Sequence, residues 1–447
     1  MSKIEDDEIG KIIGGRSHLL TRLIRAAREG HLCVEGGEVD CEVEELNGDE
    51  EWFDKRVGKW GNLFYLQRNW VLENRVVKEI KRLLGVAPLT LIDKKCNLEG
   101  MNEKQRLAVE VGSREVVTCL TGGPGTGKTF TIEKIVEQFR GKVCVCALTG
   151  KLCAILREKL DVEVKTIHQM LGVRGTRDLL FGESLLGYDM VIVDECSMIE
   201  VGMWARLLKG IGERTQLILV GDQDQLPPVE AGRVFGELCR FMKRSGRGYV
   251  HLDQCMRSDR KDILEMAKRV KEGEEIKYAP LKEGVEGWWN RGYQLLSCVR
   301  GGEYGVERMN HLLEQSEGNA QPIIMTQTSY RMGISNGEMG ILQDGQVSIG
   351  NRQFKEELVP EYEKGYCLSV HKSQGSEFKR VVLLVPKGSE RFGREVLYTG
   401  ITRAKDEIVV LSEEGVIEKC VKHSSPSMSG LRKKLQSHTP LLLDHSY

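Results

Sequence analysis

The chain has 447 residues, enough for two or three domains with buried cores. Its formal net charge is −1, with 40% hydrophobic and 29% charged residues, which is typical of a soluble globular protein. This balance argues against a uniformly basic nucleic-acid coat, although a local basic groove is compatible with it. No apolar stretch approaches membrane-spanning length and residues 1–8 lack the form of a secretory signal, so we expect a cytoplasmic protein with no membrane partner.

Residues 1–90 differ from the rest of the chain. Helical patterning over 18–28 and 70–84 flanks an acidic stretch, 35–51, that contains no basic residue. The stretch is either a solvated loop or a docking surface for a basic partner. We therefore expect a small, mainly helical N-terminal domain at 1–90, which would be a partner-docking domain if the acidic stretch is a docking surface.

Residues 121–129 read Thr-Gly-Gly-Pro-Gly-Thr-Gly-Lys-Thr, the pattern of a phosphate-binding loop. An apolar run at 116–120 precedes the loop, and helical spacing over 129–139 follows it. A helix that begins there directs its positive dipole end at a phosphate. The alternative is a Gly-rich turn with a solvated lysine. The residues predicted to bind ATP are Gly122, Gly123, Pro124, Gly125, Thr126, Gly127, Lys128 and Thr129, with Lys128 on the β/γ oxygens and the Thr129 hydroxyl on Mg²⁺.

An acidic pair follows the next motif-bearing strand, at 189–193. Asp194 is predicted to hold Mg²⁺ through water, and Glu195 to orient and deprotonate the attacking water. An isolated Asp-Glu pair after apolar residues is common, but its position after a phosphate-binding loop makes hydrolysis the better reading. A further strand, 216–220, leads to Gln225, which we expect to sense the γ-phosphate. A polar turn stiffened by two prolines is the alternative there.

Short apolar runs alternate with helical segments over 101–246 and again over 249–411, which predicts two parallel α/β sheets. We place the first lobe at 91–246 and the second at 247–447, with a short helix near 429–436. The thirteen cysteines show no paired C-x-x-C spacing, and several lie in apolar strands. A reduced protein without a zinc site is expected.

These motifs and their order resemble superfamily 1 helicases and, in detail, the RecD family, the alpha subunits of exodeoxyribonuclease V. Six stretches carry the resemblance: TGGPGTGKT at 121–129, DECSM at 194–198, GDQDQLPPVEAG at 221–232, NGEMG at 336–340, CLSVHKSQGSEF at 367–378 and LYTGITRA at 397–404. Residues 63–70, leading into a helix, are similar to a feature ahead of the motor in that family. The resemblance implies two RecA-like lobes with ATP between them.

The resemblance also implies roles for single residues around ATP. Gln105 matches the glutamine that reads adenine, and Glu377 matches a residue near the ribose. Arg257 and Arg403 match catalytic arginines that reach the γ-phosphate from the second lobe. Guanidinium groups across the cleft stabilise transition-state charge only when the lobes close, so hydrolysis is tied to lobe movement. For any one arginine the alternative is a surface salt bridge.

A single-stranded DNA track is implied by the same resemblance. Its contacts touch the strand backbone, so binding should tolerate any sequence and weaken with salt. The residues assigned to DNA binding are Thr149, Thr166, His168, Ser369 and His371. An insertion at 172–188 matches a strand-separating pin, and 338–364 a small β-barrel over the track; both could equally be surface loops. His168 alone would fit a structural histidine.

Two departures from the family stand out. Leu148 replaces a proline before the DNA-contacting turn, and Cys196 replaces an alanine after the acidic pair. The main hypothesis is an ATP-driven 5′–3′ DNA helicase that acts on single strands and duplex ends, in a heterotrimer with RecB-like and RecC-like subunits in double-strand break repair. No nuclease cluster is found, which fits a motor subunit whose nuclease lies elsewhere.

The alternatives are a free-standing helicase, the helicase part of a conjugative relaxase, or an assembly subunit that binds ATP and DNA without unwinding. The relaxase lacks support because no upstream domain with a catalytic tyrosine and histidine cluster is present. Intact Lys128, Glu195 and Arg403 argue against an assembly subunit. A small-molecule kinase is also disfavoured, because such an enzyme needs no second lobe that carries residues 369–378.

Overall fold

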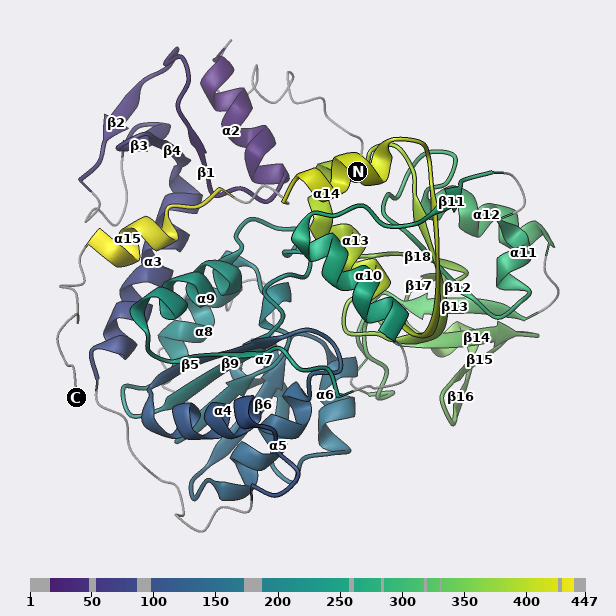
Figure 1. Cartoon of the computed structure of the whole chain (residues 1–447), viewed down its shortest axis with the longest axis horizontal. Coiled ribbons are helices and arrows are strands. Elements are labelled where there is room, and N and C mark those ends of the chain that lie inside the picture. The colour runs from purple at the N-terminus through teal and green to yellow at the C-terminus, as the bar shows by residue number, and fades with distance from the viewer. Residues whose placement is uncertain are drawn as a thin grey trace.

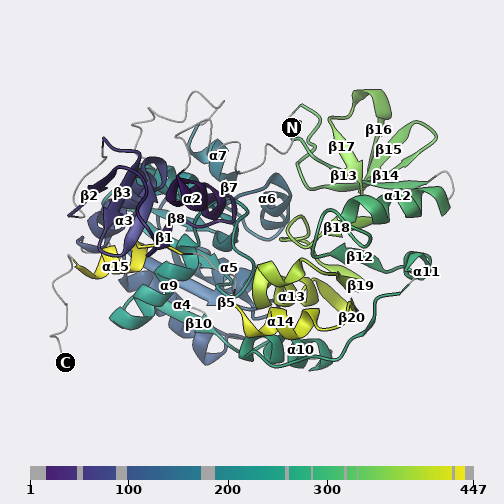
Figure 2. The ribbon, with the colours of Figure 1, turned by 90° about the horizontal axis from the view of Figure 1, so that it is seen from above.

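A computed structural model describes residues 17–47, 54–86, 98–172, 187–256, 261–282, 285–316, 320–329, 331–424 and 428–437. They form four sheets. Two of these sheets are parallel, and with their helices they make up two α/β lobes, the largest structural units. In Figure 1 the N-terminal domain (purple) lies beside the first lobe (blue and teal), and the second lobe (green and yellow) lies across from both; Figure 2 shows the same order from above.

The N-terminal domain combines the two predicted helices with a sheet. Helix α2 has the predicted bounds, and α3 begins a few residues before its predicted start. The strand order β1-β4-β3-β2 was not predicted, because strands of three or four residues give little periodicity. The elements are α2 (His18–Arg28), β1 (Cys33–Glu35), β2 (Val43–Glu45), β3 (Val57–Trp60), β4 (Leu63–Leu66) and α3 (Gln67–Leu84).

Part of the acidic stretch is structural rather than free surface. Asp40 accepts hydrogen bonds from the Ser17 hydroxyl and from the backbone N–H groups of His18 and Leu19, at the start of α2. An acceptor at this position satisfies donors that the helix itself leaves open. These backbone N–H groups hold the pKa of Asp40 below its usual value. The stretch therefore caps a helix, and its role toward partners stays a prediction.

The first lobe is a six-stranded parallel sheet in the order β10-β5-β9-β8-β6-β7, with helices on both faces. Alternate residues of its strands belong to two hydrophobic clusters, one on each face of the sheet. Val191 and Val193 belong to the first cluster, and Met190 and Ile192 belong to the second. The elements are α4 (Glu103–Arg114), β5 (Val117–Gly122), α5 (Lys128–Gln138), β6 (Val143–Ala147), α6 (Gly150–Arg157), β7 (Glu163–Thr166), α7 (Ile167–Met170), β8 (Met190–Val193), the 3-10 helix η2 (Cys196–Met198), α8 (Val201–Gly210), β9 (Gln216–Gly221), α9 (Val234–Ser245) and β10 (Tyr249–Leu252).

The second lobe is a five-stranded parallel sheet in the order β11-β20-β19-β12-β18. Together the two sheets confirm the predicted pair of RecA-like lobes. The elements are α10 (Lys261–Glu272), β11 (Ala279–Pro280), α11 (Glu286–Trp289), β12 (Gln294–Ser297), α12 (Val306–Ser316), β18 (Cys367–Ser369), β19 (Phe378–Val385), the 3-10 helix η4 (Ser389–Phe392), α13 (Gly393–Ile401), β20 (Ala404–Ser412) and α14 (Val416–Lys422).

A separate antiparallel sheet interrupts the second lobe, with the strand order β16-β15-β14-β13-β17. It includes the predicted insertion, 338–364, but begins earlier, with β13. Its elements are β13 (Gln321–Met325), β14 (Met339–Gln343), β15 (Gln346–Ile349), β16 (Arg352–Lys355), the 3-10 helix η3 (Glu356–Leu358) and β17 (Tyr362–Lys364). The predicted pin, 172–188, lies almost entirely outside the described residues.

Two predicted domain boundaries need correction. Strand β10 was assigned to the second lobe, yet it pairs in parallel with β5 of the first sheet, with Tyr249 opposite Cys119. The last described helix, α15 (Leu431–Ser437), was also assigned to the second lobe, but it packs against α3 and α9. Both errors arise because sheet order and long-range docking are not encoded in local periodicity. Among the described helices, none is long and apolar enough to cross a membrane.

A buried lysine fixes α15 onto the N-terminal domain. The Lys434 Nζ atom lies 2.8 Å from Glu73 Oε1 and donates to Asn74 Oδ1 at 2.6 Å. It also lies 3.6 Å from the centroid of the Trp70 ring, a cation–π distance. The Lys434 and Glu73 side chains are only 4% and 0% exposed. The C-terminal segment and the N-terminal domain are thus held by an ion pair that water cannot replace.

Lys434→Ala is expected to destabilise the protein by about 3–5 kcal/mol, because it leaves the Glu73 carboxylate buried without its charge partner. Denaturant unfolding measures the loss. The control is Arg432→Ala on the same helix. The Arg432 side chain is 48% exposed and lies 3.9 Å from the carboxylate of its partner, Glu237, so we expect a loss of about 0.5 kcal/mol or less. Equal effects of the two variants would contradict a structural role for Lys434.

Candidate nucleotide site between the two lobes

The phosphate-binding loop lies between the end of β5 and the start of α5. Gly125 and Gly127 have φ of 73° and 84°, a region that residues with a side chain rarely adopt. The Lys128 Nζ atom donates to the carbonyl oxygens of Gly122 and Gly123 at 2.7 and 3.0 Å, so its ammonium is held inside the loop. Thr129 follows in the first turn of α5 and is half-buried. This is a cradle of backbone N–H groups with one lysine in it.

Gln105 lies against the same loop, as its predicted role requires. Its Nε2 atom donates to the Thr126 carbonyl at 3.2 Å, and a Cβ atom at Gly127 would collide with that Nε2. The side chain is fixed from the other end by Asn102, since the two residues form a capping box at the start of α4. Met256 closes this edge, because its N–H donates to the Gly125 carbonyl at 2.9 Å.

The acidic pair follows β8 in the same sheet. Burial raises the pKa of Asp194 to about 7, the Glu195 charge adds to the rise, and the Lys128 ammonium opposes it. Glu195 has a φ of 54°, uncommon for a residue with a side chain, and its Oε2 atom is buried without a protein partner. Strained backbone at a buried carboxylate is a feature of functional sites.

These residues fit Mg²⁺ bound together with a triphosphate. The Thr129 hydroxyl and the Asp194 carboxylate are the oxygen ligands that Mg²⁺ prefers. When bound, the ion would supply positive charge that stabilises the negative charge developing on the phosphates during hydrolysis. The described residues contain no group of three or more His, Cys, Asp or Glu side chains that could hold a metal ion by themselves.

Gln225 lies in the loop after β9, buried beside Asp222. Its Nε2 atom is 3.4 Å from Asp222 Oδ2, and its Oε1 atom is buried without a protein partner. The Tyr398 hydroxyl, from the second lobe, donates to Asp222 Oδ2 at 2.8 Å. The same hydroxyl lies 3.0 Å from the place where a Cβ atom at Gly123 would stand. Tyr398 therefore joins the second lobe to both nucleotide loops.

Sequence reasoning assigned no role to Tyr398, although it stands five residues before Arg403 in the quoted motif. Burial raises its pKa and the Asp222 carboxylate adds to that rise, so the hydroxyl remains a donor at neutral pH. Its place in the same quoted motif as Arg403 was the available signal. What the sequence could not give is its partner, which lies 176 residues away.

Arg403 is 3% exposed and stands two residues after the end of α13. Its guanidinium donates to the carbonyls of Thr399 at 3.0 Å and Ser376 at 3.2 Å, and to the Thr402 hydroxyl at 3.2 Å. These acceptors are neutral, so they orient the charge without cancelling it. Arg257 lies outside the described residues. Glu377 forms an ion pair with Lys405 at 3.2 Å, and its contact with the ribose stays a prediction.

The residues assigned to DNA lie at helix starts and on the second lobe. Thr149 caps α6, and Thr166 caps α7 in a capping box with Gln169. Ser369 is buried at the end of β18, where its hydroxyl accepts from the Lys372 N–H at 3.2 Å. A capping threonine already serves the helix, so its backbone neighbours would be the ones to meet a phosphate. Their DNA contacts stay predictions.

Lys151 is a residue of this region that sequence reasoning did not select. Its Nζ atom donates to the Ser376 hydroxyl at 2.7 Å, across 225 residues, and so joins the two lobes. Burial lowers its pKa, and the Glu338 charge opposes that shift. The adjacent Gly150 touches Ser335 so closely that a Cβ atom would collide with it. The first lobe, the second lobe and the inserted sheet thus meet at the predicted DNA turn.

The two histidines assigned to DNA are both held toward the neutral form. Burial lowers the pKa of His168, Arg206 lowers it further, and Glu200 opposes the shift. Burial lowers the pKa of His371 to about 4, and the Arg391 charge adds to this shift. A neutral imidazole contributes hydrogen bonds rather than charge to a phosphate contact.

His371→Gln is expected to make stability less sensitive to acid. The unfolded state takes up a proton near pH 6.5 and the folded state only near pH 4, so stability present above pH 6.5 is lost as the pH falls through this window. The variant should lose less than the wild type, as measured by melting temperature between pH 7 and pH 4. His311→Gln, on the exposed side of α12, is the control. An unchanged acid slope would contradict the buried, neutral state of His371.

The chain is similar to several known proteins. A family described as an AAA domain matches residues 100–284, and one described as a UvrD-like helicase C-terminal domain matches residues 364–411. A RecBCD enzyme subunit RecD from Mycolicibacterium smegmatis is 28% identical over 92% of this chain and 92% of its own length. An ATP-dependent RecD2 DNA helicase from Deinococcus radiodurans is 27% identical over 76% of this chain and 54% of its own length.

A solved structure of a Pif1 helicase at forked double-stranded DNA aligns with a TM-score of 0.49 and 17% identity, covering 72% of this chain and 94% of that one. The fold and the site define a P-loop nucleoside triphosphatase with two RecA-like lobes. The chain is similar to superfamily 1 helicases and, in detail, to RecD subunits, as its motifs predicted.

Proposed function

We propose that this chain is an ATP-dependent DNA helicase that moves 5′ to 3′ on single-stranded DNA as the RecD-like motor subunit of a RecBCD-type complex. One observation carries the proposal: the P-loop, the acidic pair and the Gln225 loop follow neighbouring strands of one parallel sheet, and the Tyr398 hydroxyl of the second lobe donates to Asp222 in the Gln225 loop. Ligands of parallel sheets bind at the carboxyl ends of the strands.

The chemistry that this geometry supports is hydrolysis gated by the lobes. Lys128 binds the β/γ phosphates, Thr129 and Asp194 hold Mg²⁺, and Glu195 orients and deprotonates the attacking water. Arg403 stabilises the negative charge of the transition state when the lobes close. Gln225 senses the γ-phosphate and passes its presence to the second lobe through Asp222 and Tyr398.

The DNA proposal rests on the cluster where three parts of the chain meet. Thr149, Lys151 and Ser376 come from both lobes, and Glu338 from the inserted sheet lies near Lys151. A strand bound across this cluster would be gripped by both lobes, so opening and closing of the cleft would move it. RecB-like and RecC-like partners and a cytoplasmic location belong to the same proposal, supported by similarity to RecD over nearly the whole chain.

A free-standing helicase is the second candidate. It is favoured by the similarity to the RecD2 helicase, a longer protein whose sequence extends well beyond the region that this chain matches. Two measurements separate the candidates. ATP turnover by the chain should rise with single-stranded DNA of any sequence and fall with added salt. Sedimentation with RecB-like and RecC-like subunits should then give one complex. DNA-stimulated turnover without complex formation would favour the free-standing helicase, and no turnover with or without the subunits would refute both.

A further inference from the structure

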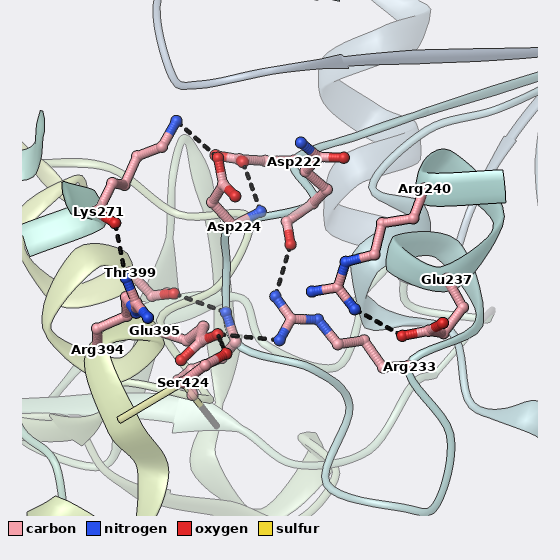
Figure 3. Close-up of polar contacts among 12 residues, drawn as sticks. Asp222, Asp224, Arg233, Glu237, Arg240, Lys271, Arg394, Glu395, Thr399 and Ser424 are labelled. Atoms are coloured by element: carbon pink, nitrogen blue, oxygen red, sulfur yellow. Dashed lines mark hydrogen bonds and ion pairs between the residues drawn. The ribbon is translucent and has the colours of Figure 1, made fainter. Parts of the chain in front are cut away.

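Arg233 reaches from the first lobe to two different partners at the lobe interface. It stands immediately before α9, and its guanidinium donates through one nitrogen to Glu395 Oε1 at 2.9 Å and through another to the Gln223 carbonyl at 2.7 Å. Figure 3 shows this fork between the Gln223 loop and the second lobe. The Arg233 and Glu395 side chains are 9% and 4% exposed, so the pair is buried.

Glu395 belongs to the helix that makes the other contacts with the same loop. On α13, the Tyr398 hydroxyl donates to Asp222 and the Thr399 hydroxyl accepts from the Leu226 N–H at 2.9 Å. Positions 395, 398 and 399 have the i, i+3, i+4 spacing of one helix face. One face of α13 therefore contacts the loop around Gln225 directly through Tyr398 and Thr399 and indirectly through the Glu395–Arg233 pair, and the chain reaches Arg403 just after this helix ends.

The Arg233 guanidinium also borders the surroundings of Gln225. A cavity of about 10 Å³, room for about one water, is lined in part by Ser197, Gln225 and Arg233. The Ser197 hydroxyl and Gln225 Oε1 are both buried there without a protein partner. Ser197 follows the acidic pair by two residues. Arg233 is thus the charged wall of the space between the acidic-pair segment and the Gln225 loop.

We propose that Arg233 is a positioning residue, which with Glu395 couples the Gln223–Leu226 loop to α13 so that the γ-phosphate signal reaches the second lobe. This inference deepens the proposed helicase function and rests on it. Arginine suits the task because its rigid planar fork holds two acceptors in fixed directions. A lysine keeps the charge but lacks that fork. A buried carboxylate separated from its cation is strongly disfavoured, so the pair resists separation when the lobes move.

A peripheral pair on the same loop behaves differently. Lys271 of α10 lies 2.6 Å from Asp224, and both side chains are about a third exposed, at 32% and 31%. Exposed pairs contribute little because solvent screens them. Arg394 donates to the Lys271 carbonyl at 2.9 Å and so ties α10 to α13. The buried Arg233–Glu395 pair, rather than this one, is positioned to transmit movement.

The test compares Arg233→Lys with Arg240→Lys. Arg240 lies on α9, is 47% exposed and pairs with Glu237 at 2.6 Å. It pairs with no described residue of the second lobe. Arg233→Lys is expected to lower DNA-stimulated kcat by about ten- to a hundredfold while the KM for ATP changes less than about twofold, because the loop is misplaced and the P-loop is intact. Arg240→Lys should leave both values unchanged.

A second readout does not depend on activity. In nucleotide-free protein, backbone amides of residues 223–226 should exchange hydrogen faster in Arg233→Lys than in the wild type, and at the wild-type rate in Arg240→Lys. Wild-type kcat in Arg233→Lys, or a lower melting temperature without faster loop exchange, would overturn the coupling role. If the wild type itself shows no DNA-stimulated turnover, the helicase proposal fails, and the exchange comparison still decides whether Arg233 holds the loop.

Discussion

Lys128→Gln is expected to reduce ATP hydrolysis by about a hundredfold or more, because it removes the one cation that the structure holds inside the phosphate-binding loop. The two glycine carbonyls that Lys128 contacts are the groups a triphosphate would displace. The glutamine side chain is nearly as long as the lysine side chain but carries no charge, so folding of α5 should be preserved. Initial rates of phosphate release, with and without single-stranded DNA, measure the loss.

Lys134→Gln is the matched control for this variant. Lys134 lies on the same helix and pairs with Glu137 at 2.6 Å, so it tests the loss of a lysine from α5 away from the loop. We expect its turnover to match the wild type. Turnover that survives in Lys128→Gln would mean that the glycine-rich loop does not bind the reacting phosphates.

Arg403→Lys is expected to lower the DNA-stimulated kcat by about a thousandfold, the effect of removing an arginine that stabilises transition-state charge. The planar guanidinium is fixed by three neutral oxygens of its own lobe, and lysine cannot reproduce these directions. Binding of ATP should be retained, because the P-loop lies on the other lobe. Single-turnover rates and the affinity for a fluorescent ATP analogue separate the two effects.

Arg380→Ala is the comparison for Arg403. Arg380 lies on β19 of the same lobe, is 51% exposed and is 3.6 Å from Glu407, so its loss should leave kcat unchanged. A melting temperature for Arg403→Lys close to that of the wild type would show that the kinetic loss is not a folding defect. An unchanged kcat in Arg403→Lys would contradict its proposed role.

Local pattern was sufficient for the elements that carry the motifs. Helix α2 could be predicted to the residue because its apolar face has helical spacing and Ser17 is a good cap. The strands before Gly122, Asp194 and Asp222 are apolar runs of the length that buried parallel strands have. The resemblance of these motifs to superfamily 1 helicases then implied a nucleotide between two lobes.

What the sequence could not provide is which distant residues meet. Lys434 belongs to the short helix that was assigned to the second lobe, yet it pairs with Glu73 of the N-terminal domain. Arg233 and Glu395 are 162 residues apart, and each alone reads as an ordinary charged residue. Strand β10 belongs to the first sheet through its pairing with β5, a fact of sheet order rather than of composition. Contacts of this kind depend on packing between elements, to which periodicity is blind.

A helicase of this kind moves in one direction along single-stranded DNA at the expense of ATP. Displacement of streptavidin from oligonucleotides that carry biotin at either the 3′ or the 5′ end measures this movement without requiring unwinding or a particular sequence. We expect ATP-dependent displacement from the 3′ end only, and none by Lys128→Gln. Displacement from the 5′ end only, or equal displacement without ATP, would contradict this expectation.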